Sequence, residues 1–182
     1  MKVTPLKYHG HLLQHIMEES GQPINLCFQC GKCSAGCPMI EEFDFPPNMV
    51  MRMVQLGQCE ELLTSRAIWM CVSCETCGAR CPNGIETAPV MDSLRALCLA
   101  EGIKPADKAT VDLHTAFTGN IKTFGRLHEA SMLLFYKLKN KRISMDDIEL
   151  GVKLFFRGKI PLFPRRSGDI RKIRNLFEES GR

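Results

Sequence analysis

The sequence predicts an all-α protein organised around two cysteine-rich loops. Apolar residues recur mainly at the three- and four-residue spacing of amphipathic helices, and few segments alternate with the period of two that is typical of strands. The chain also contains 10 cysteines, and most of them lie in two short runs between residues 27 and 81. We therefore expect helices that pack around two loops, with the cysteines holding those loops in place.

The two cysteine runs share one spacing pattern. The first contains Cys27, Cys30, Cys33 and Cys37 followed by Pro38, and the second contains Cys71, Cys74, Cys77 and Cys81 followed by Pro82. Both read C-x2-C-x2-C-x3-C-P, and each cysteine of the second run lies 44 positions after its counterpart. This is the spacing of ferredoxins with two [4Fe–4S] clusters, in which the fourth cysteine of each run binds the other cluster.

The spacing therefore predicts two crossed sets of ligands. One [4Fe–4S] cluster is expected on Cys27, Cys30, Cys33 and Cys81, and a second on Cys71, Cys74, Cys77 and Cys37. Soft thiolates suit iron–sulfur clusters, and four of them satisfy the four irons of a cubane. Two zinc sites with four cysteines each are the alternative, although zinc usually binds pairs of C-x2-C separated by a longer gap.

Helices are expected on both sides of each run. The first spans about residues 5–20 and ends at Gly21, after which the first run follows as a loop. Between the runs, Pro47 can begin a helix over 48–56 that ends at Gly57, and another helix is expected over 60–69. The second run leads into a helix over about 88–100, which ends at Gly102.

The rest of the chain also has a helical pattern. Helices are expected at about 105–117, 126–139, 145–156 and 169–179, the third with Ser144 at its N-terminus. Segment 158–166 contains Pro161 and Pro164 and is either an extended segment that lies on another surface or a plain linker. We predict a cluster domain over residues 1–104 and a helical extension over 105–182 that docks on a partner subunit. Deleting residues 158–182 should then release this chain from its partner and leave both clusters intact.

Charge and composition limit the possible functions. Residues 1–120 hold 9 Lys+Arg and 13 Asp+Glu, whereas residues 121–182 hold 15 and 7, so the basic charge gathers in the tail. No recognisable nucleic-acid module accompanies it, and we expect no nucleic-acid partner. No apolar run approaches the roughly 18 residues of a membrane span, and the N-terminus has no secretory signal pattern. We expect a cytoplasmic protein whose cysteines are metal ligands rather than disulfides.

The sequence predicts no catalytic residue. Eight cysteines on two cubanes leave no iron open to a substrate, and no phosphate-binding glycine loop or nucleophile motif is present. Two cysteines remain outside the runs. Cys98 lies in an apolar helix and is expected to be a small core residue, while Cys59 is a reserve ligand only if the crossed assignment fails.

The stretch Cys27-Phe-Gln-Cys-Gly-Lys-Cys-Ser-Ala-Gly-Cys-Pro38, the helical spacer and the second run closely resemble the iron–sulfur subunit of heterodisulfide reductase that is designated C. The resemblance is most specific over residues 24–102, and the segment around Pro161 and Pro164 is also similar to that family. It implies an α-helical ferredoxin fold with two [4Fe–4S] clusters. All eight cysteines of the family pattern are present at the positions named above.

The resemblance also implies partners and a role. In that family, this subunit passes electrons from the subunit designated A, which contains flavin and iron–sulfur clusters, to the catalytic one, designated B, which reduces the coenzyme M–coenzyme B heterodisulfide. A hydrogenase or formate dehydrogenase module supplies electrons in the larger complex, which performs flavin-based electron bifurcation in methanogenesis. This chain lacks the adjacent-cysteine motifs of the catalytic partner, so the active site is expected elsewhere.

Three other interpretations remain open. Related α-helical ferredoxin modules occur in complexes of sulfur metabolism, succinate or fumarate conversion and glycolate oxidation, and this chain is an electron relay in any of them. It is also compatible with an autonomous ferredoxin. A zinc-stapled scaffold is the rival from a different functional class, and metal analysis distinguishes it from the others.

Overall fold

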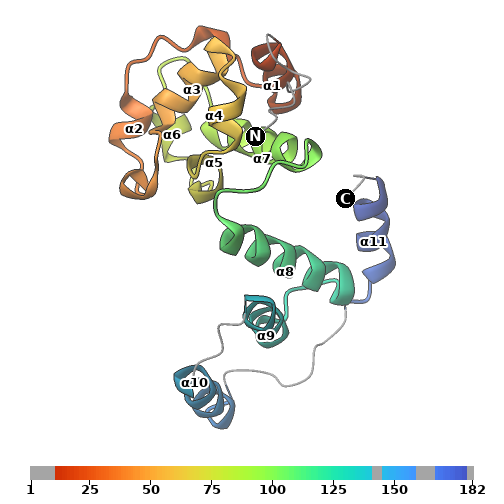
Figure 1. Cartoon of the computed structure of the whole chain (residues 1–182). Coiled ribbons are helices and arrows are strands. Elements are labelled where there is room, and N and C mark those ends of the chain that lie inside the picture. Colours follow the sequence, from red (N-terminus) through yellow and green to blue (C-terminus); the bar gives the residue numbers. More distant parts are fainter. Residues whose placement is uncertain (1–10, 141–144, 159–166, 180–182) are drawn as a thin grey trace. The chain divides into compact units, whose positions relative to one another are not determined.

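The computed structural model describes residues 11–140, 145–158 and 167–179, and the helical fold class is confirmed (Figure 1). These residues form helices and connecting turns, with no strand among them. The chain divides into two compact units, residues 1–108 and 109–182. Among the described residues, no helix is both long and apolar enough to cross a membrane.

The first unit contains seven α-helices and two short 3-10 helices among its described residues. In chain order these are α1 (Leu12–Ser20), η1 (Ile24–Leu26), α2 (Lys32–Ala35), η2 (Ile40–Glu42), α3 (Pro47–Leu56), α4 (Cys59–Leu63), α5 (Ala67–Met70), α6 (Thr76–Arg80) and α7 (Thr87–Ala100). Helix α1 contacts both α3 and α7, and α7 also contacts α4 and α5. The cysteine runs are thus attached to one helical core.

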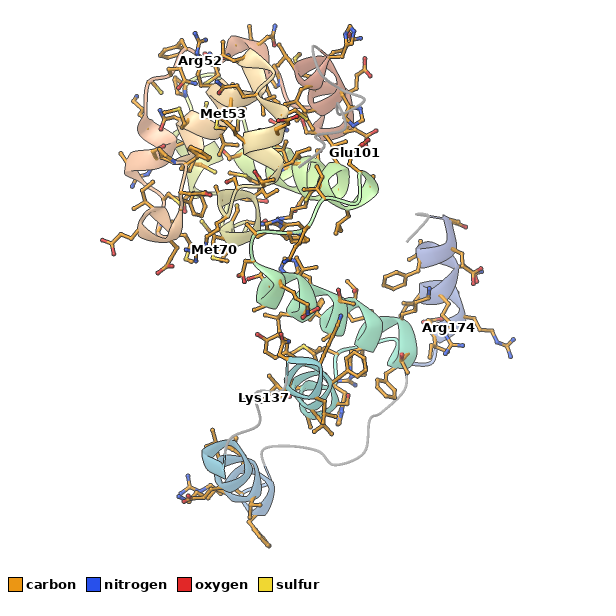
Figure 2. The ribbon with its side chains drawn as sticks, viewed as in Figure 1. Arg52, Met53, Met70, Glu101, Lys137 and Arg174 are labelled. Carbon is orange, nitrogen blue, oxygen red and sulfur yellow. The ribbon has the colours of Figure 1, made fainter. Side chains whose placement is uncertain are left out.

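Apolar side chains from all the longer helices of this unit form its core. The largest fully buried ones are Leu12, Ile16, Ile24, Val50, Val54, Leu62, Leu63, Ile68, Val90, Met91 and Leu94, and Met53 is also buried (Figure 2). Burying side chains of this size stabilises a fold by about 1.5–3 kcal/mol each. The core therefore supports the loops that carry the cysteines.

Several predicted helix boundaries are confirmed. Helix α3 begins at Pro47 and ends at Gly57, whose φ of 69° is the left-handed conformation that suits glycine at a C-cap. Helix α7 ends shortly before Gly102, which also has a positive φ. Helix α1 also ends at its predicted glycine, and its described part begins at Leu12; the start predicted near residue 5 lies outside the described residues.

The single helix predicted over residues 60–69 is wrong, because the chain breaks into α4 and α5 there. Asp44 causes the break: its carboxylate accepts hydrogen bonds from the Ser65 hydroxyl and from the N–H groups of Arg66 and Ala67, at 2.7–2.8 Å. These bonds fix the start of α5 and replace helical partners. The cysteine runs are also not simple loops, since each contains a short helix, α2 or α6.

The second unit contains α8 (Lys108–Phe124), α9 (Glu129–Asn140), α10 (Met145–Phe156) and α11 (Ile170–Glu179). Helix α8 runs to Phe124, past the predicted end at 117, and stops at Gly125, whose φ is 74°. The next helix begins at Glu129 rather than 126, because the Asn120 side chain accepts a hydrogen bond from the His128 N–H at 2.7 Å. The predicted cap Ser144 and the Pro161–Pro164 segment lie outside the described residues.

Helix α11 packs on the end of α8. The Ser167 N–H donates to the Phe124 carbonyl at 2.9 Å, and Arg174 donates to the Lys122 carbonyl at 3.2 Å (Figure 2). In contrast, several large apolar side chains of α9 and α10 are exposed: Leu133, Leu134, Phe135, Leu138, Leu150, Val152 and Phe156. This unit therefore presents apolar surface that the described part of the chain does not cover.

Candidate metal centre

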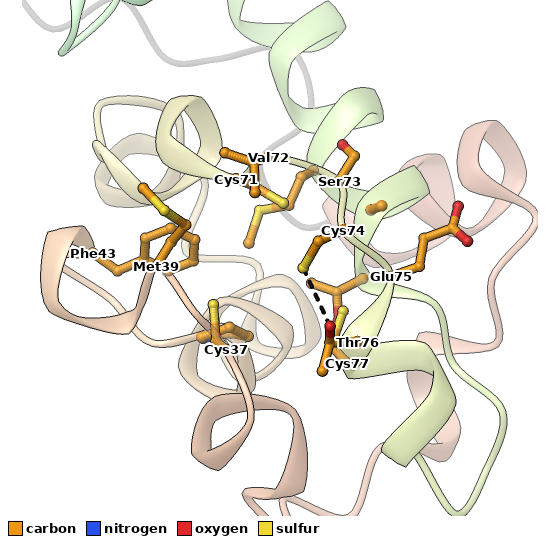
Figure 3. A pocket seen from close by; sticks show the side chains of 14 residues that line it. Cys37, Met39, Phe43, Cys71, Val72, Ser73, Cys74, Glu75, Thr76 and Cys77 are labelled. Carbon is orange, nitrogen blue, oxygen red and sulfur yellow. Dashed lines mark hydrogen bonds between the residues drawn. The ribbon is translucent and has the colours of Figure 1, made fainter.

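Two cavities in the first unit gather the cysteines into two sets. Each cavity is lined by three cysteines of one run and the fourth cysteine of the other run. The first contains Cys27, Cys30, Cys33 and Cys81, and the second contains Cys71, Cys74, Cys77 and Cys37 (Figure 3). The short helices α2 and α6 contact each other, which brings the two runs together. These are the same two sets that the spacing predicts.

The backbone turns at matching positions in both runs. Gln29 and Ser73, which are 44 positions apart, both have a positive φ, of 62° and 51°. Gly31 and Glu75, also 44 positions apart, have φ values of 74° and 60°. A left-handed conformation costs a non-glycine residue of order 1–3 kcal/mol and persists where the surroundings impose it. The repeated turns give each run the same curvature around its cavity.

One polar side chain fixes the start of each run. Gln55 of α3 donates to the carbonyls of Ile24 and Cys27, at 2.9 Å each. Arg95 of α7 donates in the same way to the carbonyls of Ile68 and Cys71. Ile68 and Cys71 lie 44 positions after Ile24 and Cys27, so the same two carbonyls are held in both runs. The first site uses a neutral amide for this purpose and the second a cation.

Polar side chains contribute to the lining of the first cavity, beside Met51 and Ile85. Gln29 Nε2 lies 3.3 Å from Cys27 Sγ, and Asn48 Nδ2 donates to Gln29 Oε1 at 3.3 Å. The backbone N–H of Asn48 donates to the Ser34 hydroxyl at 3.0 Å, and that hydroxyl donates to Asn48 Oδ1. Hydrogen bonds to cluster sulfurs are one determinant of reduction potential. The Gln29 amide would therefore influence the reduction potential of a cluster bound in this cavity.

The second cavity is lined by a different set of side chains. Its apolar residues are Met39, Phe43, Pro47, Val72, Ala88 and Met91, and its polar residues are Ser73, Glu75, Thr76 and Thr87. A polar contact in this cavity joins Cys74 Sγ and Thr76 Oγ1, which lie 3.5 Å apart (Figure 3). The two sites therefore share a backbone plan but differ in the groups that surround the thiols.

The thiols differ in acidity for physical reasons. Burial raises the pKa of Cys33. Burial also raises the pKa of Cys71, although the hydrogen bond from the Ser73 backbone and the charge of Arg95 oppose that shift. Hydrogen bonding with Thr76 lowers the pKa of the exposed Cys74. Metal ligation requires the thiolate form, so metal binding by these cysteines releases protons.

Lys32 and Arg80, the cations within the two cysteine runs, are both exposed. The Arg80 side chain nonetheless lies against Gly36: a Cβ added to this glycine would be 2.6 Å from the Arg80 Cδ atom. Arg80 thus reaches from the second run to the first, and Gly36 leaves room for it. The small residue at position 36 has a packing reason that the sequence pattern by itself does not reveal.

The remaining cysteines do not line either cavity. Cys98 is fully buried in α7, where its thiol contacts the Leu63 carbonyl at 3.3 Å, so its predicted core role is confirmed. Cys59 is also buried, at the first position of α4. Burial raises the pKa of each of these thiols to about 11.

The donor sets fit cubane clusters. Each cavity offers four thiols, and in a cubane each thiolate binds a different iron. Across the described ranges, no group of three or more His, Cys, Asp or Glu side chains is arranged to hold a single metal ion. Cys27, Cys30, Cys33 and Cys81 would hold one cluster, and Cys71, Cys74, Cys77 and Cys37 the other.

The region that contains the cysteine runs matches a known protein family. Residues 26–86 match the model of the family described as 4Fe-4S dicluster domain. This part of the chain is similar to a 4Fe-4S dicluster domain. The matched region contains every cysteine of the two runs, and therefore all the cysteines that line the two cavities. Iron–sulfur cofactors of the [4Fe–4S] type are thereby supported for this chain.

Curated relatives confirm the resemblance drawn from the cysteine runs. The chain is 31% identical over 103 residues to the iron–sulfur subunit of CoB–CoM heterodisulfide reductase from Methanopyrus kandleri. This match covers 57% of this chain and 54% of that protein. It is 28% identical over 163 residues to an iron–sulfur subunit of the same name from Methanocaldococcus jannaschii, covering 89% and 76%.

A third relative is the corresponding subunit of ferredoxin:CoB-CoM heterodisulfide reductase from Methanosarcina acetivorans, at 33% identity over 81 residues, or 44% of this chain and 32% of that protein. The chain thus spans about half the length of the first curated relatives that it matches.

The side chains that support the cysteines were not predicted from the sequence. Gln55, Arg95, Asn48 and Asp44 are polar residues within or beside helices, and their periodicity resembles that of ordinary surface positions. Their partners are 14 to 31 positions away in the chain. The 44-residue repeat is the sequence feature that could have indicated them. It predicts that a side chain that hydrogen-bonds to the first run has a counterpart that hydrogen-bonds to the second run.

Proposed function

We propose that this chain is an electron-relay subunit that carries two [4Fe–4S] clusters. The observation that carries the proposal is the crossed grouping of the eight cysteines in two neighbouring cavities. When bound, each cluster accepts and releases one electron. The protein supplies four thiolates to each cluster, which leaves no iron open to a substrate, and it fixes the two loops side by side through α2 and α6.

We further propose that the relay belongs to a heterodisulfide reductase complex. The names of the relatives support this assignment, since each is a subunit of such an enzyme. Electrons would pass from a flavin-containing partner through the two clusters to the catalytic partner, where the heterodisulfide of coenzymes M and B is reduced. A hydrogenase or formate dehydrogenase module would supply them, with coupling by electron bifurcation in the cytoplasm. No catalytic residue is assigned to this chain.

The second unit is proposed to bind the partner subunits. Its basic charge and the exposed apolar side chains of α9 and α10 support this role, because large apolar patches on a surface mark interaction sites. The first unit has a core of fully buried apolar residues, although Leu26, Phe28, Leu56, Val72 and Leu99 are more than half exposed there.

Metal content and pairs of substitutions test the relay together with its ligand sets. Anaerobically purified protein should contain iron and sulfide at about eight each. The crossed sets predict that Cys37→Ser combined with Cys71→Ser removes one cluster and retains about four irons. Cys37→Ser combined with Cys27→Ser, which touches both sets, should remove both clusters.

The paired variants are matched, because each removes two thiols, one of them Cys37. Equal iron loss in both variants would contradict the crossed ligand sets while leaving the relay function standing. Zinc without sulfide in the wild-type protein would overturn the relay function itself and favour a structural scaffold.

A further inference from the structure

The two cluster sites differ in the charge of the side chain that holds the first cysteine. At the first site, the neutral Gln55 amide donates to the carbonyls of Ile24 and Cys27, and the exposed side chain of Arg52 donates to Gln55 Oε1 at 3.2 Å. At the second site, the Arg95 guanidinium donates to the carbonyls of Ile68 and Cys71. The hydrogen-bonding task is the same at both sites, so a positive charge is not needed to perform it.

The charge of Arg95 is poorly screened by solvent. Its side chain is 13% exposed, and its guanidinium is attached through a hydrogen bond to the residue whose thiol lines the second cavity. Buried charges are screened much less by water and salt than exposed ones. A cation at this position favours the extra negative charge that a cluster carries when it is reduced.

Asp92 limits this effect. Its carboxylate lies 2.8 Å from Arg95 Nη1, one turn earlier on α7, and its own side chain is 62% exposed. The carboxylate neutralises part of the guanidinium charge but, being mostly in water, it is itself better screened. The pair therefore leaves part of the guanidinium charge unneutralised at the Cys71 loop, where Glu75 also lines the cavity.

We infer that Arg95 is a positioning residue that also raises the reduction potential of the cluster at the second site, and that Asp92 moderates this effect. The inference rests on the proposed function, since it requires a cluster on Cys71, Cys74, Cys77 and Cys37. It assigns the Arg95–Asp92 pair a role that Gln55 does not have at the first site. The two otherwise similar sites thus differ in the charge of the side chain that donates to the loop carbonyls, which is neutral in Gln55 and positive in Arg95.

Two substitutions should shift the same potential in opposite directions. Arg95→Gln supplies the amide that Gln55 uses at the first site, so hydrogen bonding to the loop can persist while the charge is lost. The potential of one cluster should fall. Asp92→Asn keeps an oxygen acceptor for Arg95 but removes the negative charge, so the potential of that same cluster should rise.

Arg66→Gln is the matched control. Arg66 lies immediately before α5 and carries the same charge, but its side chain is 53% exposed and its backbone N–H, which binds Asp44, is unchanged by the substitution. The full-length protein and the three variants are compared by anaerobic redox titration followed by EPR. Arg66→Gln should move neither potential measurably.

The outcomes separate this inference from the proposed function. Opposite shifts of one cluster in Arg95→Gln and Asp92→Asn support the inference. If the Arg95→Gln protein does not retain that cluster, the reduction potential measured in Asp92→Asn decides whether the inference stands. This variant keeps the guanidinium in place, so the potential of the cluster should rise. Two intact clusters whose potentials in Asp92→Asn match those of Arg66→Gln would overturn the inference, whereas absence of iron and sulfide from the wild type would overturn the proposed function instead.

Discussion

At the scale of single residues, the ten cysteines fall into two chemically different groups. Eight line the two cavities, where their thiols converge. Cys59 and Cys98 lie in the apolar core at 1% and 0% exposure, and burial raises the pKa of each to about 11; nearby Glu101 and Glu60 add to the shift at Cys59. A thiol is a nucleophile only when it is deprotonated, so burial makes these two cysteines inert.

This difference predicts the alkylation behaviour of the protein. At pH 8, a thiol with a pKa of about 11 is deprotonated in only about one molecule in a thousand. The folded protein with its clusters bound should therefore incorporate almost no iodoacetamide at pH 8, as measured by intact-protein mass spectrometry. The same sample, unfolded in guanidinium with an iron chelator, should take up ten labels. One or two rapid labels on the folded protein would contradict the core assignment of Cys59 and Cys98.

At the scale of elements, Asp44 links the spacer between the runs to the helix that delivers the second run. Its carboxylate accepts from Ser65, Arg66 and Ala67, and α5 then leads directly to Cys71. Burial by itself would raise the pKa of Asp44, but these hydrogen bonds outweigh it and hold the pKa below the ordinary value of 3.8. The carboxylate thus stabilises the folded state in its charged form.

Asp44→Asn should lower the thermal stability of the protein. Loss of a helix-capping carboxylate typically costs about 1 kcal/mol, which corresponds to a decrease in midpoint of about 5 °C for a domain of this size. Because the pKa of Asp44 is lowered on folding, its contribution is fully present above pH 3.8 and is lost as the pH falls through the lowered value. The difference from wild type should therefore stay constant between pH 5 and 8, measured by circular dichroism.

Glu41→Ala is the control for this substitution, since Glu41 is an exposed carboxylate in the same spacer. It should leave the midpoint within about 1 °C of wild type. An Asp44→Asn protein as stable as Glu41→Ala would mean that the contacts with α5 contribute nothing to stability.

At the scale of the whole molecule, the two units treat their apolar residues differently. The first unit buries many large aliphatic side chains between α1, α3, α4 and α7, although Leu26, Leu56, Val72 and Leu99 are more than half exposed. In the second unit, α9 leaves Leu133, Leu134, Phe135 and Leu138 between 46% and 59% exposed. This distribution is consistent with a cofactor domain that folds around its own core and an extension that completes its packing on another protein.

The proposed docking role predicts a selective loss of partner binding. Leu134 and Leu138 are one helical turn apart on α9, and replacing both by glutamine keeps helix propensity while removing apolar surface. Co-purification with tagged partner subunits should decrease at least tenfold, while the iron content stays at about eight. Leu99→Gln is the control, because Leu99 is 55% exposed on α7 of the first unit and should not affect binding. Unchanged co-purification of the double variant would contradict docking through α9.

Much of the dicluster domain follows from the sequence alone. The cysteine spacing predicts the cofactor class and the crossed sets because a cubane needs four thiolates at fixed short separations, which leaves few workable patterns. The helical periodicity predicts most helices, and Gly57, Gly102 and Pro47 mark their ends, since these residues have restricted or unusual backbone conformations. The resemblance to the iron–sulfur subunit of heterodisulfide reductase rests on these same residues.

The tertiary structure decided what local pattern cannot. The break at residues 64–66 depends on Asp44, which is about 20 positions away, and the Gln55 and Arg95 contacts span 24 to 31 positions. Hydrogen bonds of this kind depend on where the chain returns in space, whereas periodicity and spacing report only neighbours along the chain. The sequence by itself therefore determined the helical class and predicted the thiol ligands, and the tertiary structure decided which polar and charged side chains surround each proposed cluster site.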